Sequence, residues 1–300
     1  MTGAAPPPAP ITLGDGTAWD VDLPPAVIGL HVLHLLNHDF SAAEQWVFPQ
    51  LGIDRGSRRR TGRAMTSTLH DYRWRNKALA MELLVALLFS RIDSPVGVQS
   101  ACLTDPATGL PDTFAPSGRA DVSVSYRVRS PERTVRIVVE ASAMRFMPID
   151  NFRAQLTQAV KHARDLQEPP VDATYALVVN TAPILRYKGF HEMYRAILQR
   201  EGVADDPSIR LVAINAAELA LALCDLAASL PADQFPFRTE QLFDVLDTLY
   251  EGLRRRQSSP NPEWMRKVWS DIIVDGVAPE LALPEEPGDD AAGGPAGEAS

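Results

Sequence analysis

The clearest alternation of hydrophobic and polar positions lies in the middle of the chain. Valine and tyrosine alternate with serine and arginine over 122–128, a period of two that predicts a strand with one buried face. The segment 134–141 is rich in β-branched residues and follows a Ser-Pro-Glu-Arg turn at 130–133, which predicts a second strand antiparallel to the first. Together the two segments predict a β-hairpin.

Helical and strand patterns alternate after this hairpin. Apolar residues recur every three or four positions over 150–167, whereas 173–180 and 209–215 are continuous apolar stretches, typical of buried parallel strands. Further helices are predicted at 188–200, 216–230, 239–256 and 262–274. This order predicts an α/β fold with a mixed central β-sheet flanked by helices.

The chain before the hairpin has the patterns of helices and loops. Helices are predicted at 25–38, 41–48 and 70–91. Residues 54–64 are rich in arginine, and residues 97–118 are rich in Pro, Gly, Thr and Ser, so we predict loops over both segments.

The two ends of the chain differ in composition from the rest. Residues 1–24 and 282–300 are rich in Pro, Ala, Gly and acidic residues, and we expect both tails to be disordered. Between them we expect a single α/β domain over 25–281. Its expected parts are a core of about 70–230 and helical additions at 25–69 and 236–275.

Composition narrows the class of protein. A hydrophobic content of 45% and a charged content of 22% are ordinary for a globular protein. Cys102 and Cys224 are isolated in sequence, which favours neither a disulfide framework nor a Cys-x-x-Cys metal site and is typical of the cytoplasm. No Lys or Arg precedes Arg55, and the most apolar helix, 78–89, is short and contains Glu82. We therefore expect a cytoplasmic protein without a secretory signal or a membrane span.

The net charge of −9 conceals an uneven distribution. Eight of the 38 acidic residues lie in the first 24 and last 16 positions, which leaves 30 acids against 29 Lys and Arg in the body of the chain. A basic segment at 54–77 favours contact with nucleic-acid phosphates, with an exposed loop or a protein-binding surface as alternatives. The predicted phosphate contacts are Arg58, Arg59, Arg60, Arg63, Arg75 and Lys77.

Two carboxylates flank the predicted hairpin. Asp121 opens the first strand and Glu140 closes the second, and cross-strand neighbours in a hairpin lie only about 5 Å apart. Such a pair repels unless a cation lies between the two groups, and Mg²⁺ or Mn²⁺ prefers oxygen ligands of this type. The alternative is that both are ordinary, solvated strand ends.

These residues resemble the motif of the PD-(D/E)XK, or restriction-endonuclease-like, nuclease superfamily. Ala120-Asp121 stands at the Pro-Asp position, with Ala in place of Pro, and Glu140-Ala141-Ser142 stands at the (D/E)XK position. Gln155 and Gln158 resemble the glutamine that many relatives carry on the next helix, and Glu82 resembles the additional acid that some members use. The resemblance implies a core of helix, acid-bearing hairpin, helix and further strand and helix.

One position departs from this pattern. Ser142 occupies the place of the family's lysine, which normally positions water and offsets the charge of the phosphate. Lys161 lies three residues after Gln158 and is one replacement for that charge, and Arg145 is another.

The resemblance implies a metal-dependent endonuclease that hydrolyses phosphodiester bonds in DNA, with RNA as the alternative substrate, in a defence or restriction context. Asp121 and Glu140, with Glu82, are the expected ligands of Mg²⁺ or Mn²⁺. Ser142 and Lys161 would share water positioning and charge stabilisation, and Gln158 would orient the water or the phosphate. The alternatives are an inactive subunit of the same fold that binds nucleic acid or a protein partner in a larger assembly, and a module that binds an acidic protein partner. A homodimer is compatible with the resemblance, because nucleases of this kind often dimerise to cut both strands.

A second cluster of possible ligands lies near the start of the chain. His31, His34 and His38 share one face of a predicted helix, but together they span two turns, about 10 Å, which is too long for one tetrahedral zinc ion. This spacing favours a packing or pH-sensitive surface over a metal site.

Overall fold

The computed structural model describes a discontinuous set of residues. The described residues are 10–19, 28–29, 77–90, 95–107, 111–113, 115–116, 118–129, 132–143, 148–166, 170–180, 189–217, 219–220, 239–255, 267–268 and 271–272. Within this part of the chain, no helix combines the length and the apolar character that crossing a membrane requires.

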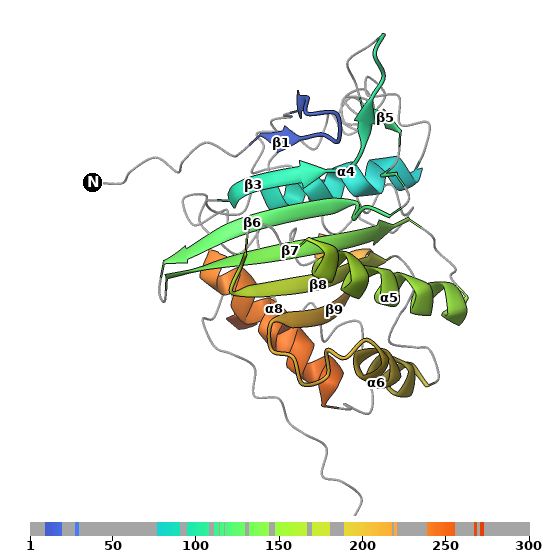
Figure 1. The fold of residues 1–300 in the computed structure, drawn as a ribbon, viewed down its shortest axis with the longest axis vertical. Helices are drawn as coiled ribbons and strands as arrows, with labels where there is room; N and C mark the ends of the chain where they lie inside the picture. The colour runs from blue at the N-terminus through green and yellow to red at the C-terminus, as the bar shows by residue number, and fades with distance from the viewer. Residues whose placement is uncertain are drawn as a thin grey trace, which may run out of the picture.

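A mixed seven-stranded β-sheet forms the centre of the molecule, in the order β2-β1-β3-β6-β7-β8-β9 (Figure 1). Its strands are β1 (Ile11–Thr12), β2 (Ala18–Trp19), β3 (Pro95–Ser100), β6 (Val122–Arg129), β7 (Glu132–Ser142), β8 (Ala173–Asn180) and β9 (Ile209–Asn215). Two short strands, β4 (Leu103–Thr104) and β5 (Pro111–Thr113), pair separately. The principal helices are α4 (Lys77–Ser90), α5 (Ile149–Asp165), α6 (Phe190–Arg200) and α8 (Thr239–Arg254). The predicted α/β class and mixed sheet are confirmed.

The predicted hairpin is β6–β7, with Val122 opposite Val139 at one end and Arg129 opposite Glu132 at the other. Strand β3 runs antiparallel to β6 on the outer side of the hairpin, whereas β8 is parallel to β7 and β9 is parallel to β8. All eight residues of β8 are buried, as its continuous apolar sequence predicts. The carboxyl ends of β7, β8 and β9 therefore lie along one edge of the sheet.

Helices α4 and α8 cover one face of the sheet, and helix α5 covers the other face over different strands. On one face, the Tyr126 hydroxyl donates to the carbonyl of Phe89 in α4, and the Tyr126 ring packs edge-on against Phe243 of α8. On the other face, α5 packs over β7, β8 and β9 (Figure 1). Phe152 of α5 stacks on Phe190 of α6. Because α5 lies over these three strands, a groove remains beside it, above β3 and β6.

Strands occupy two segments where the sequence analysis places none. Residues 11–19, expected within a disordered tail, form β1 and β2 and bury Ile11, Leu13 and Trp19. Residues 95–113, expected to belong largely to a loop, include β3, β4 and β5. These strands contain two to six residues, and β3 includes Pro and Gly, so pairing with neighbouring strands, and not local propensity, stabilises them.

Several predicted segments lie wholly or largely outside the described residues. They include the helices at 25–38 and 41–48, the basic loop at 54–64, the histidines at 31, 34 and 38, and the tail at 282–300. Of the predicted helices at 216–230 and 262–274, only residues 216–217, 219–220, 267–268 and 271–272 are described, and these are helical.

Candidate active site

The register of the β6–β7 hairpin brings Asp121 beside the end of β7. Because Val122 pairs with Val139, the next position outward places Asp121 at the level of Glu140. The backbone N–H of Ala141 donates to Oδ2 of Asp121 at 2.7 Å, and Ala101 N–H donates to the Asp121 carbonyl at 3.0 Å. Asp121 is therefore held by hydrogen bonds from both neighbouring strand ends.

Glu82 adds a third carboxylate from α4, on the opposite side of the sheet from α5. It is only 5% exposed, although it lies on a helix that is otherwise almost entirely apolar. Its Oε2 accepts hydrogen bonds from the Cys102 thiol at 3.2 Å and from Ala115 N–H at 3.3 Å. Three segments distant in sequence thus each supply one acid to the same region.

The three acids affect one another electrostatically. Burial, followed by the charge of Glu82, raises the pKa of Asp121 to about 7. Burial, followed by the charges of Asp121 and Glu82, raises the pKa of Glu140 to about 9. Burial also raises the pKa of Glu82 itself. At neutral pH the group does not hold three negative charges without a proton or a cation to compensate them.

His162 on α5 joins this group, although the sequence analysis did not select it. Its Nδ1 lies 2.5 Å from Oε1 of Glu140, and the Gln158 amide nitrogen lies 2.7 Å from its Nε2. The His162 and Glu140 side chains are only 5% and 13% exposed, and burial lowers the pKa of the His162 ring. The ring is therefore neutral, accepts a hydrogen bond from Gln158 at Nε2, and donates its Nδ1 proton to Glu140.

The spacing of Gln158 and His162 is the signal that could have found this contact. Four residues apart on a helix, they share one face, and Gln155 precedes them by one turn on that face. The Asn180 amide at the end of β8 donates to Gln155 Oε1 at 3.1 Å. One polar stripe of α5 thus lies over the carboxyl ends of β7 and β8.

The other predicted site residues lie in different environments. Ser142 is 6% exposed at the end of β7, two residues beyond Glu140 and opposite Asn180 in the register. Lys161 is exposed on α5, whereas Gln158 is half-buried on the same helix. Lys77 is the first residue of α4, and Arg145 and the predicted phosphate contacts Arg58, Arg59, Arg60, Arg63 and Arg75 lie outside the described residues.

The acids supply the oxygen ligands that a hard cation prefers, but they do not form a complete coordination sphere. Among the described residues, no group of three or more His, Cys, Asp or Glu side chains is arranged to hold a metal ion. The hydrogen bonds above engage Oε2 of Glu82, Oδ2 of Asp121 and Oε1 of Glu140, which leaves one further oxygen on each carboxylate. Carboxylate oxygens suit Mg²⁺ and Mn²⁺, and a cation here would compensate the charges that raise the pKa values of Asp121 and Glu140.

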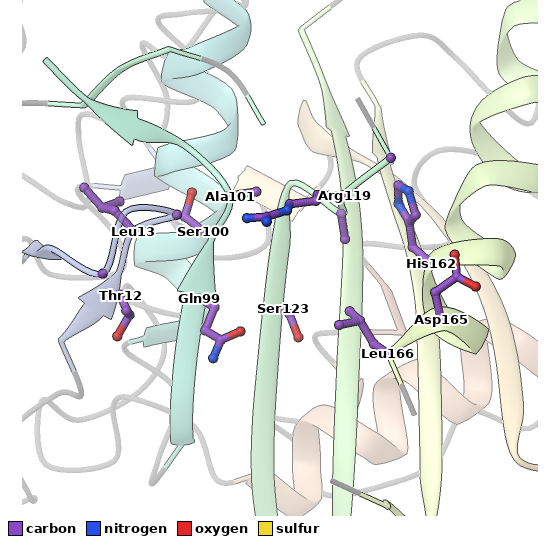
Figure 2. Close-up of a pocket in the computed structure, with 14 residues that line it drawn as sticks. Thr12, Leu13, Gln99, Ser100, Ala101, Arg119, Ser123, His162, Asp165 and Leu166 are labelled. Carbon is purple, nitrogen blue, oxygen red and sulfur yellow. The ribbon is translucent and has the colours of Figure 1, made fainter. Parts of the chain in front are cut away.

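A groove of about 430 Å³ opens beside the acids (Figure 2). Its floor contains Gln99 of β3 and Ser123 of β6, which are partners in the sheet. One wall is the turn between β1 and β2, and the other is the end of α5, which contributes His162 and Leu166. His162 therefore both lines the groove and contacts Glu140.

The strand connection that leads to Asp121 closes one end of this groove. Gly118, Arg119 and Ala120 belong to its lining. Gly118 adopts a left-handed backbone with φ of 87°, a conformation that favours glycine. Arg119 is exposed, and Figure 2 shows its side chain extending over the end of β6 toward Ala101. A cationic group thus lies two residues before the acid.

Neither a scan against protein-family models nor a search of the curated proteins finds a match for this chain. The function is therefore inferred from the chemistry of the site.

Proposed function

We propose that the protein is a metal-dependent nuclease that hydrolyses phosphodiester bonds in DNA. The observation that carries this proposal is the convergence of Glu82, Asp121 and Glu140 at the end of the β6–β7 hairpin, where burial raises all three pKa values and neighbouring charge raises those of Asp121 and Glu140 further. The order of elements from α4 to β8 includes a helix, the acid-bearing hairpin, a second helix and a parallel strand. This order supports a restriction-endonuclease-like fold. Clustered acids with perturbed pKa values are typical of a functional site.

The three carboxylates would hold Mg²⁺ or Mn²⁺ through the oxygens that their present hydrogen bonds leave over. When bound, such an ion polarises a phosphate oxygen and lowers the pKa of a coordinated water. The chain itself positions the acids. Ala141 N–H fixes the Asp121 carboxylate, and the neutral His162 ring orients Glu140.

Positive charge for the phosphate has to come from a position other than that of Ser142. Arg119 is exposed at the end of the groove and two residues before Asp121, so its guanidinium suits contact with a phosphate oxygen of a bound strand. Lys161 is exposed on α5 and is the second source of charge.

A direct test uses supercoiled plasmid incubated with the full chain and Mg²⁺, Mn²⁺ or EDTA. We expect metal-dependent nicking that falls about 100-fold or more in Asp121→Asn and in Glu140→Gln, because each change removes a charged metal ligand. Glu132→Gln is the matched control, since Glu132 is an exposed acid at the far end of the same strand. Nicking that is unaffected by EDTA, or that persists in both site variants, would disprove the proposal.

A second candidate function is a nuclease-fold subunit that binds nucleic acid without cutting it. The buried Ser142 at the position of the family's lysine favours this reading, because a hydroxyl cannot supply the missing positive charge. Plasmid that is retarded in a gel but never nicked, with any of the metal ions, would support the second function over the first.

A further inference from the structure

The groove beside the acids has a lining that suits hydrogen bonding more than charge neutralisation. The amide of Gln99 and the hydroxyls of Ser123 and Thr12 face it, together with one cationic side chain, Arg119, and one anionic side chain, Asp165. Figure 2 shows Gln99 and Ser123 side by side on β3 and β6, with Thr12 on one side of them, Asp165 on the other and Arg119 near the end of β6. The described lining is therefore nearly neutral and rich in donors and acceptors.

One partly exposed apolar side chain, Leu166, lines the same space where it follows the last turn of α5 (Figure 2). Leu13 on the far side also belongs to the lining, but its side chain is only 2% exposed and packs in the core. Flat, mostly apolar rings with polar edges suit a site of this kind, because one ring face contacts carbon and the edges contact amides and hydroxyls. A nucleobase has this combination of faces and edges.

The size and charge of the groove distinguish a single base from a duplex. A volume of 430 Å³ lies within the range of sites that enclose one small ligand. Duplex DNA is bound through a broad set of positive charges on its phosphates, whereas this groove combines one arginine with one aspartate. Its chemistry fits the edge of an exposed base.

The position of the groove connects that base to the acids. His162 lines the groove and contacts Glu140, and Ala120 lines it immediately before Asp121. A base held over Gln99 and Ser123 would therefore extend its sugar and phosphate toward the hairpin end.

We propose that the groove receives an unpaired nucleobase of the strand whose neighbouring phosphodiester lies at Glu82, Asp121 and Glu140. This inference rests on the proposed nuclease function and specifies its substrate as a single strand or a locally unpaired duplex. Bases that are already unpaired enter without the cost of unstacking, which a fully paired duplex would have to meet. A free nucleotide presents the same chemistry, so the test has to separate the two sources.

Equilibrium binding of labelled oligonucleotides to the full chain, followed by fluorescence anisotropy with Ca²⁺ in place of Mg²⁺, tests the inference. The probes are a short single strand, the blunt duplex of the same sequence, that duplex with one unpaired base, and dAMP as competitor. We expect the single strand and the interrupted duplex to bind at least about tenfold more tightly than the blunt duplex.

Two variants change the groove itself. Ser123→Leu fills its floor, and Gln99→Leu removes an exposed amide while keeping a similar side-chain size, so each should weaken single-strand binding about five- to twentyfold. Ser125→Leu is the matched control, because Ser125 lies two residues further along β6 on the same face and outside the groove lining. Its sheet partner Gly97 has open space above it, which leaves room for the leucine. Thermal melts of all three variants verify folding.

The outcomes separate this inference from the function on which it rests. Metal-dependent nicking with equal affinity for single strand and blunt duplex, unchanged in Ser123→Leu, would overturn the base pocket and leave the nuclease. Single-strand binding that Ser123→Leu weakens, without nicking in any metal, would support the pocket and disprove the nuclease. Competition by dAMP as strong as that of the oligonucleotide would overturn the assignment to a nucleic-acid strand.

Discussion

His162 lies between two side chains that the proposed reaction would use, Glu140 on β7 and Gln158 on its own helix. A neutral imidazole has one N–H and one lone pair, so a donor at Nε2 directs the proton at Nδ1 to the carboxylate. The same arrangement is common behind metal-ligating carboxylates and histidines, where it fixes the orientation of the ligand. His162 is thus a positioning residue for Glu140.

Replacing this ring should affect the affinity for a metal ion more than it affects the fold. We expect His162→Ala to weaken Mn²⁺ binding about 10- to 100-fold in calorimetric titration, because Glu140 loses the donor that orients it. His162→Asn should recover part of the affinity, since an amide N–H can replace Nδ1–H. Asn151→Ala, at an exposed position of the same helix, is the control and should bind Mn²⁺ like the unmodified chain. Equal affinities in all variants would contradict the positioning role.

The ribbon of β1 and β2 is the element that gives the groove its second wall. It adjoins the sheet through β3, and Gly14 N–H donates to the carbonyl of Cys102 at 2.8 Å. A Cβ at Gly14 would lie 2.7 Å from the carbonyl oxygen of Ala101, closer than real contacts allow. The lack of a side chain at this position therefore permits the ribbon to pack against the sheet.

Adding a single methyl group tests that packing. We expect Gly14→Ala to lower the free energy of unfolding by about 1–3 kcal/mol, because the clash is with backbone that cannot rotate away. Gly97→Ala meets nothing within 4 Å and should leave stability unchanged or raise it by less than about 1 kcal/mol. Urea unfolding of the two variants gives the comparison, and equal effects would argue against a close contact at Gly14.

At the scale of the whole molecule, the acids make stability depend on pH. The folded-state pKa values of Asp121 and Glu140, about 7 and about 9, lie above the ordinary values of 3.8 and 4.5. Between the unfolded and folded pKa values, the folded chain therefore binds more protons than the unfolded chain. The contribution of these two acids to the free energy of unfolding is fully present below about pH 4 and is lost as pH rises through 7 and 9. A cation that binds the folded site opposes this loss.

Thermal melts of the metal-free protein across pH 5 to 9 measure this dependence. We expect the melting temperature to fall as pH rises, and Glu140→Gln to raise the free energy of unfolding at pH 8 by about 1–3 kcal/mol by removing a buried titrating acid. Added Mn²⁺ should raise the melting temperature of the unmodified chain more than that of Glu140→Gln. Glu132→Gln should follow the unmodified pH curve. A free energy of unfolding that rises with pH would contradict this prediction.

The sequence predicts the elements whose pattern is long and regular. Alternation over 122–128 and the β-branched run over 134–141 are sufficient for the hairpin, and the hairpin is sufficient to bring Asp121 and Glu140 to one end. The strands over 11–19 and 95–100 carry too little local signal, because they form through pairing with the sheet. The contact of His162 with Glu140 was not predicted, because a helical pattern indicates which face of the helix a residue lies on but not which residue of another element it contacts.

The register of the hairpin has a consequence for how such a site could vary among related chains. Asp121 and Glu140 are 19 positions apart, yet their proximity depends only on both strands being paired as far as Val122 and Val139. Equal lengthening or shortening of both arms would change that interval and leave the acids side by side. A slip of one residue in the pairing would instead turn Glu140 away from His162, because neighbouring side chains point to opposite faces. Selection would thus tolerate variable spacing but not a shifted register, and a search built on a fixed interval between the acids would overlook functional relatives.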